Sequence, residues 1–197
     1  MKLLNSSQIK IIEEIFKNPG INLTGLIEKT RLSPNYVSDY ANLLSSKNII
    51  REERLEKKRV YLRRFYLNFN SNLAKNLFML AKDERKDMLF KKYPQLRQAL
   101  EHVCSEIREM DFLLVYGSYA RLAAEKESDL DILMVGDIKN KGKIREMLVS
   151  LDLEVSIKIE TLGDFKKRMN DALHRQIIKE NILICDSGKF MGALFKK

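Results

Sequence analysis

The stretch at residues 116–136, YGSYARLAAEKESDLDILMVG, decides the fold of the C-terminal half of this chain. Residues 112–116 form a continuous apolar run, which is typical of a strand buried on both faces. The run stops at Gly117-Ser118, residues 119–124 have the composition of a helix start, and residues 125–128 form a polar loop. Residues 129–135 are a second strand. The predicted order is therefore strand, glycine-serine turn, helix and strand.

Asp129 and Asp131 alternate with apolar residues along the second strand, so their side chains share one face. Two neighbouring carboxylates repel one another, and a divalent cation removes that cost. Oxygen-only ligation favours Mg²⁺ or Mn²⁺. Gly117 and Ser118 lie where the first strand ends, and there a free backbone N–H group and a hydroxyl can hold a phosphate.

This combination resembles the DNA polymerase β-type nucleotidyltransferase superfamily, and most closely its minimal nucleotidyltransferases, whose motif runs Gly-Ser-x-Ala-Arg, a polar loop and Ser-Asp-hydrophobic-Asp. The resemblance covers roughly residues 98–197. It implies that Gly117 and Ser118 hold the triphosphate of an NTP, with ATP the expected nucleotide. It implies equally that Asp129 and Asp131 are the catalytic metal ligands.

The resemblance also implies a third carboxylate on a later strand, for which residues 153–159 are the candidate. Glu154 is the preferred residue because apolar residues flank it, and Asp152 and Glu160 are its rivals by strand parity. Arg121 has two equal interpretations, a phosphate contact or a structural ion pair. Many relatives have glycine where this chain has Leu122, which affects the loop and the base or acceptor contacts rather than the metal site.

The N-terminal half has three short helical segments. The first begins at Ser6 or Ser7 as N-cap and ends at Asn18-Pro19-Gly20, and Thr24 caps the second. Ser33-Pro34 opens the third, which turns a set of apolar residues inward: Val37, Tyr40, Ala41 and Leu44. A charged stretch at residues 51–59 and a β-rich run at residues 60–67 follow.

Three helices and a hairpin with a charged tip resemble a winged helix-turn-helix, in which the third helix enters a DNA major groove and the wing contacts the backbone. That resemblance assigns DNA contacts to Asn35 and Tyr36 on the third helix and to Lys57, Lys58 and Arg59 at the tip. The alternatives are a solvated hairpin without a binding role and a winged helix used for protein contacts. The third helix carries Asp39 and few cations, which weakens the DNA interpretation.

The totals fit a globular protein with an anionic partner. The 197 residues are 45% hydrophobic and 32% charged, and the net charge is +9. Cys104 and Cys185 are expected to be buried reduced thiols, and His102 and His174 to have structural or surface roles. The absence of a signal peptide and of a long apolar run predicts a cytoplasmic protein without membrane contact.

The predicted fold class is α+β, with a winged helix-turn-helix domain at residues 1–70 and connecting helices at 71–97. A nucleotidyltransferase-type α/β domain with a mixed sheet completes the chain at 98–197. In that last domain we expect helices at 143–150, 163–169, 171–180 and 188–194, with a short strand at 181–185. Winged-helix regulators are commonly dimers, since symmetric half-sites need two readers, so a homodimer is an expectation here.

Two functions stay open. The first is a transferase that moves an NMP from an NTP, with Mg²⁺ or Mn²⁺, to an unidentified acceptor such as a protein. The second is a DNA-binding transcriptional regulator whose nucleotidyltransferase-like domain senses nucleotide without turnover. A non-acidic residue facing Asp129 and Asp131 at the third position would favour the second.

Overall fold

The computed structural model describes residues 4–57 and 60–195 and confirms the α+β class. The chain divides into two compact units, Met1–Glu84 and Arg85–Lys197. The boundary falls within helix α4 (Asn72–Lys92), inside the segment at 71–97 that the sequence assigns to connecting helices.

The first unit contains the three predicted helices, and asparagine caps two of them. Asn5, rather than Ser6 or Ser7, is the N-cap of α1, and it forms a capping box with Gln8. Asn22, rather than Thr24, caps α2 by accepting the Gly25 N–H. Both predictions were displaced by one or two residues because asparagine is as good an N-cap as serine or threonine. The helices are α1 (Ser6–Lys17), α2 (Leu23–Thr30) and α3 (Pro34–Ser46).

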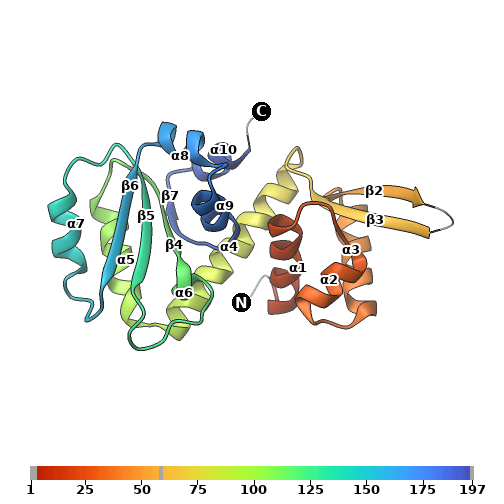
Figure 1. Cartoon of the computed structure of the whole chain (residues 1–197), viewed down its shortest axis with the longest axis horizontal. Coiled ribbons are helices and arrows are strands. Elements are labelled where there is room, and N and C mark those ends of the chain that lie inside the picture. Colours follow the sequence, from red (N-terminus) through yellow and green to blue (C-terminus); the bar gives the residue numbers. More distant parts are fainter. Residues whose placement is uncertain (1–3, 58–59, 196–197) are drawn as a thin grey trace. The chain divides into compact units, whose positions relative to one another are not determined.

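Helix α3 packs inward through the predicted residues and is followed by the predicted hairpin. Val37, Tyr40, Ala41 and Leu44 are all buried. Strands β2 (Ile50–Lys57) and β3 (Val60–Leu67) pair antiparallel, with Ile50 opposite Leu67. The short strand β1 (Ile21–Asn22) pairs with β3 on its other side, which gives the order β1-β3-β2 (Figure 1). This is the outline of a winged helix-turn-helix.

The second unit is built on a mixed four-stranded sheet in the order β6-β5-β4-β7. Strand β4 lies at its centre and pairs antiparallel with both β5 and β7, whereas β5 and β6 are parallel. The predicted strands are all present, and each end lies within two residues of the expected one. They are β4 (Met110–Tyr116), β5 (Leu130–Gly136), β6 (Val155–Glu160) and β7 (Ile182–Asp186).

Helices cover both faces of this sheet (Figure 1). Pro94 separates α4 from α5 as predicted, and α5 lies with α7 on one face. The other face carries the last three helices of the chain. The bounds of the five are α5 (Gln95–Glu106), α7 (Lys141–Leu148), α8 (Leu162–Arg168), α9 (Ala172–Lys179) and α10 (Phe190–Leu194).

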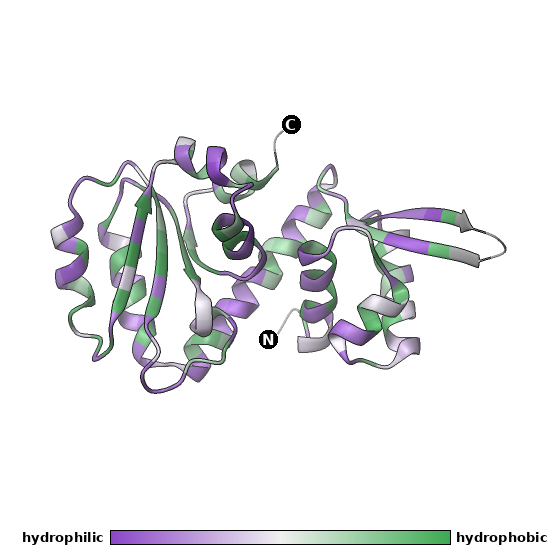
Figure 2. Ribbon diagram, in the orientation of Figure 1, coloured by the Kyte–Doolittle hydropathy of each residue, from purple (hydrophilic) through white to green (hydrophobic). Residues whose placement is uncertain are grey.

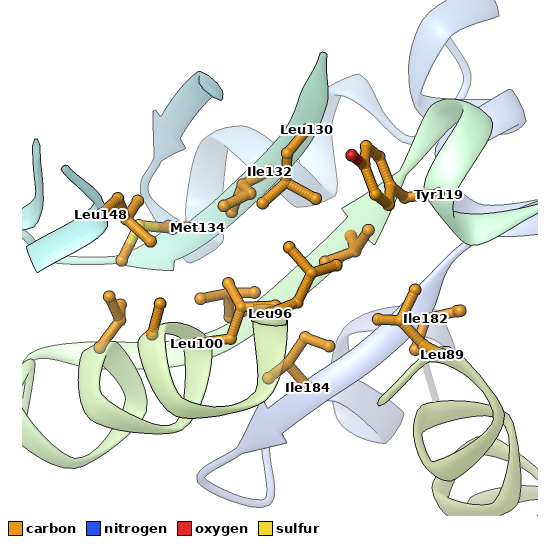
Figure 3. Close-up of a cluster of buried hydrophobic side chains, with 14 of the residues drawn as sticks. Leu89, Leu96, Leu100, Tyr119, Leu130, Ile132, Met134, Leu148, Ile182 and Ile184 are labelled. Carbon is orange, nitrogen blue, oxygen red and sulfur yellow. The ribbon is translucent and has the colours of Figure 1, made fainter. Parts of the chain in front are cut away.

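Strands β4 and β5 are hydrophobic along most of their length because both of their faces are covered (Figure 2). On the α5 side, Leu96 and Leu100 pack against Ile132 and Met134 of β5 (Figure 3). On the other side, Phe112 makes edge-to-face contacts with Phe165 of α8 and Phe190 of α10. The two central strands, β4 and β5, are therefore fixed by packing on both faces of the sheet.

The prediction of reduced thiols is wrong in this structure, because Cys104 of α5 and Cys185 of β7 form a disulfide. Their Cα atoms are 6.2 Å apart, although 81 residues separate them in the chain. The two cysteines meet because α5 packs directly on β7. Their separation in the sequence gives no sign of this contact. Within the described part of the chain, none of the helices combines the length and the hydropathy needed to cross a membrane.

The disulfide gives a direct test of the packing of α5 on β7. A Cys104→Ser, Cys185→Ser double variant should lose about 2–4 kcal/mol of stability, because a long loop is then free to open in the unfolded chain. Thermal unfolding of both proteins under non-reducing conditions measures the loss. Free thiols in the unreduced, denatured wild type would contradict the disulfide.

Candidate functional site

A cavity of about 430 Å³ lies beside the ends of β4 and β5 that the sequence singled out. Its volume is within the range of small-molecule sites in proteins. The predicted residues Gly117, Ser118, Arg121, Asp129 and Asp131 all line it. The remaining lining residues are Tyr116, Ser128, Leu173, Gln176, Ile177 and Glu180.

Gly117 brings its backbone against the Asp131 carboxylate. The short helix α6 (Gly117–Ala120) begins at this glycine, two residues earlier than predicted. Gly117 has a φ of +70°, and a Cβ there would fall on the Asp131 side chain. Strand pairing explains the approach, since Tyr116 lies directly opposite Asp131. Glycine is required by both its left-handed backbone and this contact.

Asp129 and Asp131 form an electrostatically strained pair. Asp131 is half-buried, and Asp129, just before β5, is exposed. Burial raises the pKa of the Asp131 carboxyl, and the negative charge of Asp129 raises it further. A hydrogen bond from Ser156 and the cations Lys158 and Arg121 act in the opposite direction on this pKa. A divalent cation between the two carboxylates would remove the repulsion, so the donor set fits Mg²⁺ or Mn²⁺.

Ser156 is the residue that faces this pair from the neighbouring strand. In the parallel register of β5 and β6, Asp131 lies opposite Ser156, whose hydroxyl lowers the pKa of the Asp131 carboxyl. Burial raises the pKa of the Tyr116 hydroxyl, and Ser156 acts on that pKa in the opposite direction. Sequence reasoning passed over this residue because the register between two strands cannot be derived from either strand alone.

The three acidic candidates for the third position do not line the cavity. Glu154 and Asp152 are exposed and precede β6, and the Glu154 carbonyl accepts the Leu130 N–H at 2.8 Å. Glu160 is nearly buried and bonded to His174 at 2.8 Å and to Arg168 at 3.2 Å. Across residues 4–57 and 60–195, no group of three or more His, Cys, Asp or Glu side chains is arranged to hold a metal ion.

Arg121 lines the cavity and also pairs with Glu180 at the end of α9. The Arg121 Nη1 to Glu180 Oε2 distance is 3.6 Å, and both side chains are more than two-fifths exposed. Such an exposed pair contributes little to stability. The two interpretations of Arg121 are therefore compatible, because a phosphate in the cavity would compete with Glu180 for the same guanidinium.

The loop after α6 is fixed by the C-terminal part of α4. Leu122 has a φ of +58°, a conformation that costs a non-glycine residue about 1–2 kcal/mol. Lys92 Nζ donates to the Leu122 carbonyl, and Arg85 donates to the Ala120 carbonyl at 2.9 Å. Tyr93 accepts the Ala124 N–H at 3.0 Å. These bonds hold the turn that leads to Asp129.

Helix α9 supplies a wall of the cavity that sequence reasoning did not identify. Its lining residues Leu173, Gln176, Ile177 and Glu180 recur at the spacing i, i+3, i+4 and i+7, so they share one helix face. That periodicity was visible in the sequence. The position of α9 beside the cavity was not visible, because it depends on contacts between distant segments.

The predicted DNA-contact residues differ in their exposure and in their bonds to neighbouring side chains. Asn35 is exposed on α3, whereas Tyr36 is half-buried and its hydroxyl bonds to Asn5. Lys57 ends β2, and Lys58 and Arg59 lie outside the described residues. Several wing cations are paired, including Arg54 and Arg63, which both contact Glu52. These bonds and ion pairs hold the pKa of Glu52 below its usual value.

Two family models match separate parts of the chain. One, described as polymerase beta nucleotidyltransferase, matches residues 98–189. The other, described as winged helix-turn-helix DNA-binding, matches residues 4–51. The two matches correspond to the two halves that the sequence predicted.

One curated relative is a putative protein adenylyltransferase from Methanocaldococcus jannaschii. It is 32% identical over 71 residues, which cover 34% of this chain and 71% of the relative. Among solved structures, a toxin-antitoxin crystal structure with AMP-PNP is 14% identical and has a TM-score of 0.37, over 49% of this chain and 77% of its own. A putative nucleotidyltransferase from Sulfolobus solfataricus is 23% identical and has a TM-score of 0.33, over 55% and 89%.

Asp131→Asn tests the electrostatic description of the site. At neutral pH the folded chain must ionise Asp131 against burial and against Asp129, so the neutral amide should raise stability slightly, on the order of 0.5 kcal/mol. A raised folded pKa makes this penalty appear as pH rises, so the difference should vanish in acid, where Asp131 is protonated. Thermal unfolding against pH measures it. A variant less stable than wild type at neutral pH would contradict the description.

Proposed function

The chain belongs to the polymerase β-type nucleotidyltransferase family, and from that premise we propose that it is a DNA-binding regulator that senses a nucleoside triphosphate without turning it over. The observation that carries the proposal is Ser156, a hydroxyl residue, opposite Asp131 on the adjacent strand. The winged helix-turn-helix domain of the chain supplies the DNA-binding half of the proposed function.

The nucleotide site is the cavity beside Asp129 and Asp131. In this proposal the Gly117 backbone and the Ser118 hydroxyl contact the triphosphate, and Arg121 exchanges Glu180 for a phosphate oxygen. Asp129 and Asp131 would hold one Mg²⁺ or Mn²⁺, which when bound offsets the negative charge of the phosphates and of the two carboxylates. The raised pKa of Asp131 supports a site that gains stability from a cation.

The proposed absence of turnover rests on the small number of carboxylates at the site. Transfer of a nucleotidyl group commonly uses two divalent cations, one of which activates the attacking hydroxyl. A second cation beside the first needs another carboxylate, and Ser156, which lies opposite Asp131, offers a neutral hydroxyl. Among the described residues that line the cavity, the other carboxylate belongs to Glu180, which pairs with Arg121.

A transferase is the second candidate, favoured by the intact Asp129 and Asp131 pair and by the relative whose name includes adenylyltransferase. In that case the acceptor hydroxyl attacks the α-phosphate of the NTP, the NMP is transferred and pyrophosphate leaves. A protein is one acceptor class. Glu154 would then have to move into the cavity to serve as the third carboxylate, since it is exposed outside β6.

The two candidates differ in how many cations the site holds. With saturating α,β-methylene-ATP, which cannot be cleaved at the α-phosphate, the wild type should bind one Mn²⁺ per chain. Ser156→Asp should bind two, because it places a carboxylate beside Asp131. Mn²⁺ titration followed by electron paramagnetic resonance counts the ions. Two ions in the wild type would refute the sensor and favour the transferase.

Ser156→Asn is the matched control for this count. Its amide has the shape of the aspartate but no charge, so it should leave the Mn²⁺ count at one. A second ion in this variant would show that the added charge is not the cause.

The DNA-binding half is tested at the wing. Reversing Lys57, Lys58 and Arg59 to glutamate removes the cations at the hairpin tip, so affinity for duplex DNA should fall and its dependence on salt should flatten. Fluorescence anisotropy at several salt concentrations measures both. Unchanged affinity and slope would mean that the tip does not contact DNA.

A further inference from the structure

We propose that α9 recognises the nucleoside portion of the bound nucleotide and that Gln176 selects adenine. The inference rests on the proposed function, since it assumes that the triphosphate lies at Gly117, Ser118 and the aspartate pair. It adds which nucleotide the site takes and which residues choose it.

The cavity has two chemically different walls. One wall is polar and charged, and it contains the residues proposed for phosphate and metal: Gly117, Ser118, Arg121, Asp129 and Asp131. The other wall is α9, and its first two turns contribute two aliphatic side chains and one amide, from Leu173, Ile177 and Gln176. A nucleoside triphosphate has the same division, with anionic phosphates at one end and a flat, largely apolar base at the other.

Leu173 is suited to contact with a base. It is 39% exposed, which makes it one of the exposed large apolar side chains of the described chain, and it is exposed into the cavity. Ile177, one turn later on the same face, is only 1% exposed and forms the floor behind it. A ligand that covered Leu173 would remove apolar surface from water, which favours binding.

Gln176 carries the polar group that can read a base edge. Its amide has one acceptor and two donors, and a glutamine amide pairs in a bidentate manner with the N6 donor and N7 acceptor of adenine. Guanine presents two acceptors on the corresponding edge, so it cannot satisfy the carbonyl of the amide. The neighbouring polar residue on this face, Glu180, is engaged with Arg121.

Helix α9 is held firmly enough to act as a recognition surface. His174, one turn before Ile177 in α9, is buried and bonded to Glu160 of β6 at 2.8 Å. Its ring also packs edge-on against Phe165 of α8. These contacts fix the helix relative to the sheet that carries Asp131, so the amide and the aspartate pair keep a constant separation.

Binding of three ligands in the presence of Mg²⁺ tests the proposal: ATP, GTP and inorganic tripolyphosphate, each titrated by calorimetry. The wild type should prefer ATP to GTP. Gln176→Leu should lower the affinity for ATP about tenfold and remove the preference for ATP over GTP, while the affinity for tripolyphosphate stays unchanged. Leu173→Ala should lower the affinities for ATP and GTP by the same factor. Val149→Ala, an exposed aliphatic residue outside the cavity, should change none of the three.

The outcomes separate this proposal from the proposed function. If Gln176→Leu still prefers ATP to GTP, α9 does not read the base. The same conclusion follows if this variant loses as much affinity for tripolyphosphate as for ATP. If the wild type binds neither ATP nor tripolyphosphate, the nucleotide site itself is wrong. Equal affinity of the wild type for ATP and GTP overturns the adenine assignment while leaving the nucleotide site intact.

Discussion

The repulsion between Asp129 and Asp131 is the constraint on which the rest of the nucleotidyltransferase-type unit depends. Folding holds both carboxylates beside one cavity because Asp131 belongs to a strand covered on both faces and Asp129 precedes it by two residues. Burial makes the ionised form of Asp131 unfavourable, and the raised pKa records that cost. A protein retains such an arrangement at the expense of stability, which is expected of a binding site.

The surrounding structure keeps this pair from relaxing. Gly117 closes one side so tightly that a Cβ would overlap Asp131, and Ser156 lies opposite Asp131 on the next strand. Leu122 accepts a left-handed backbone, with its carbonyl held by Lys92, to turn the chain toward Asp129. Lys92 and Arg85 belong to α4, the same helix that covalently joins the two units of the chain. The loop that leads into the candidate nucleotide site is therefore bonded to the connecting helix.

Local patterns in the sequence predicted the local features. Alternation along residues 129–135 predicted that the two aspartates share a face, and Ser33-Pro34 predicted the start of α3. Features that depend on register or on distant packing could not be predicted in this way. Ser156 meets Asp131 only through the parallel pairing of β5 with β6, and Cys104 meets Cys185 only because α5 lies on β7. Glu154 was preferred for its flanking residues, which describe the strand but not what lies opposite it.

Equilibrium dialysis of the wild type against α-³²P-labelled ATP and Mg²⁺, followed by chromatography of the recovered label, distinguishes nucleotide sensing from nucleotidyl transfer. If the site is a sensor, close to one nucleotide should bind per chain and the label should return as intact triphosphate, free of protein. Asp129→Asn combined with Asp131→Asn should remove the binding. Label converted to a monophosphate that is attached to a macromolecule would show that the site transfers nucleotide, and the sensor would be the wrong function.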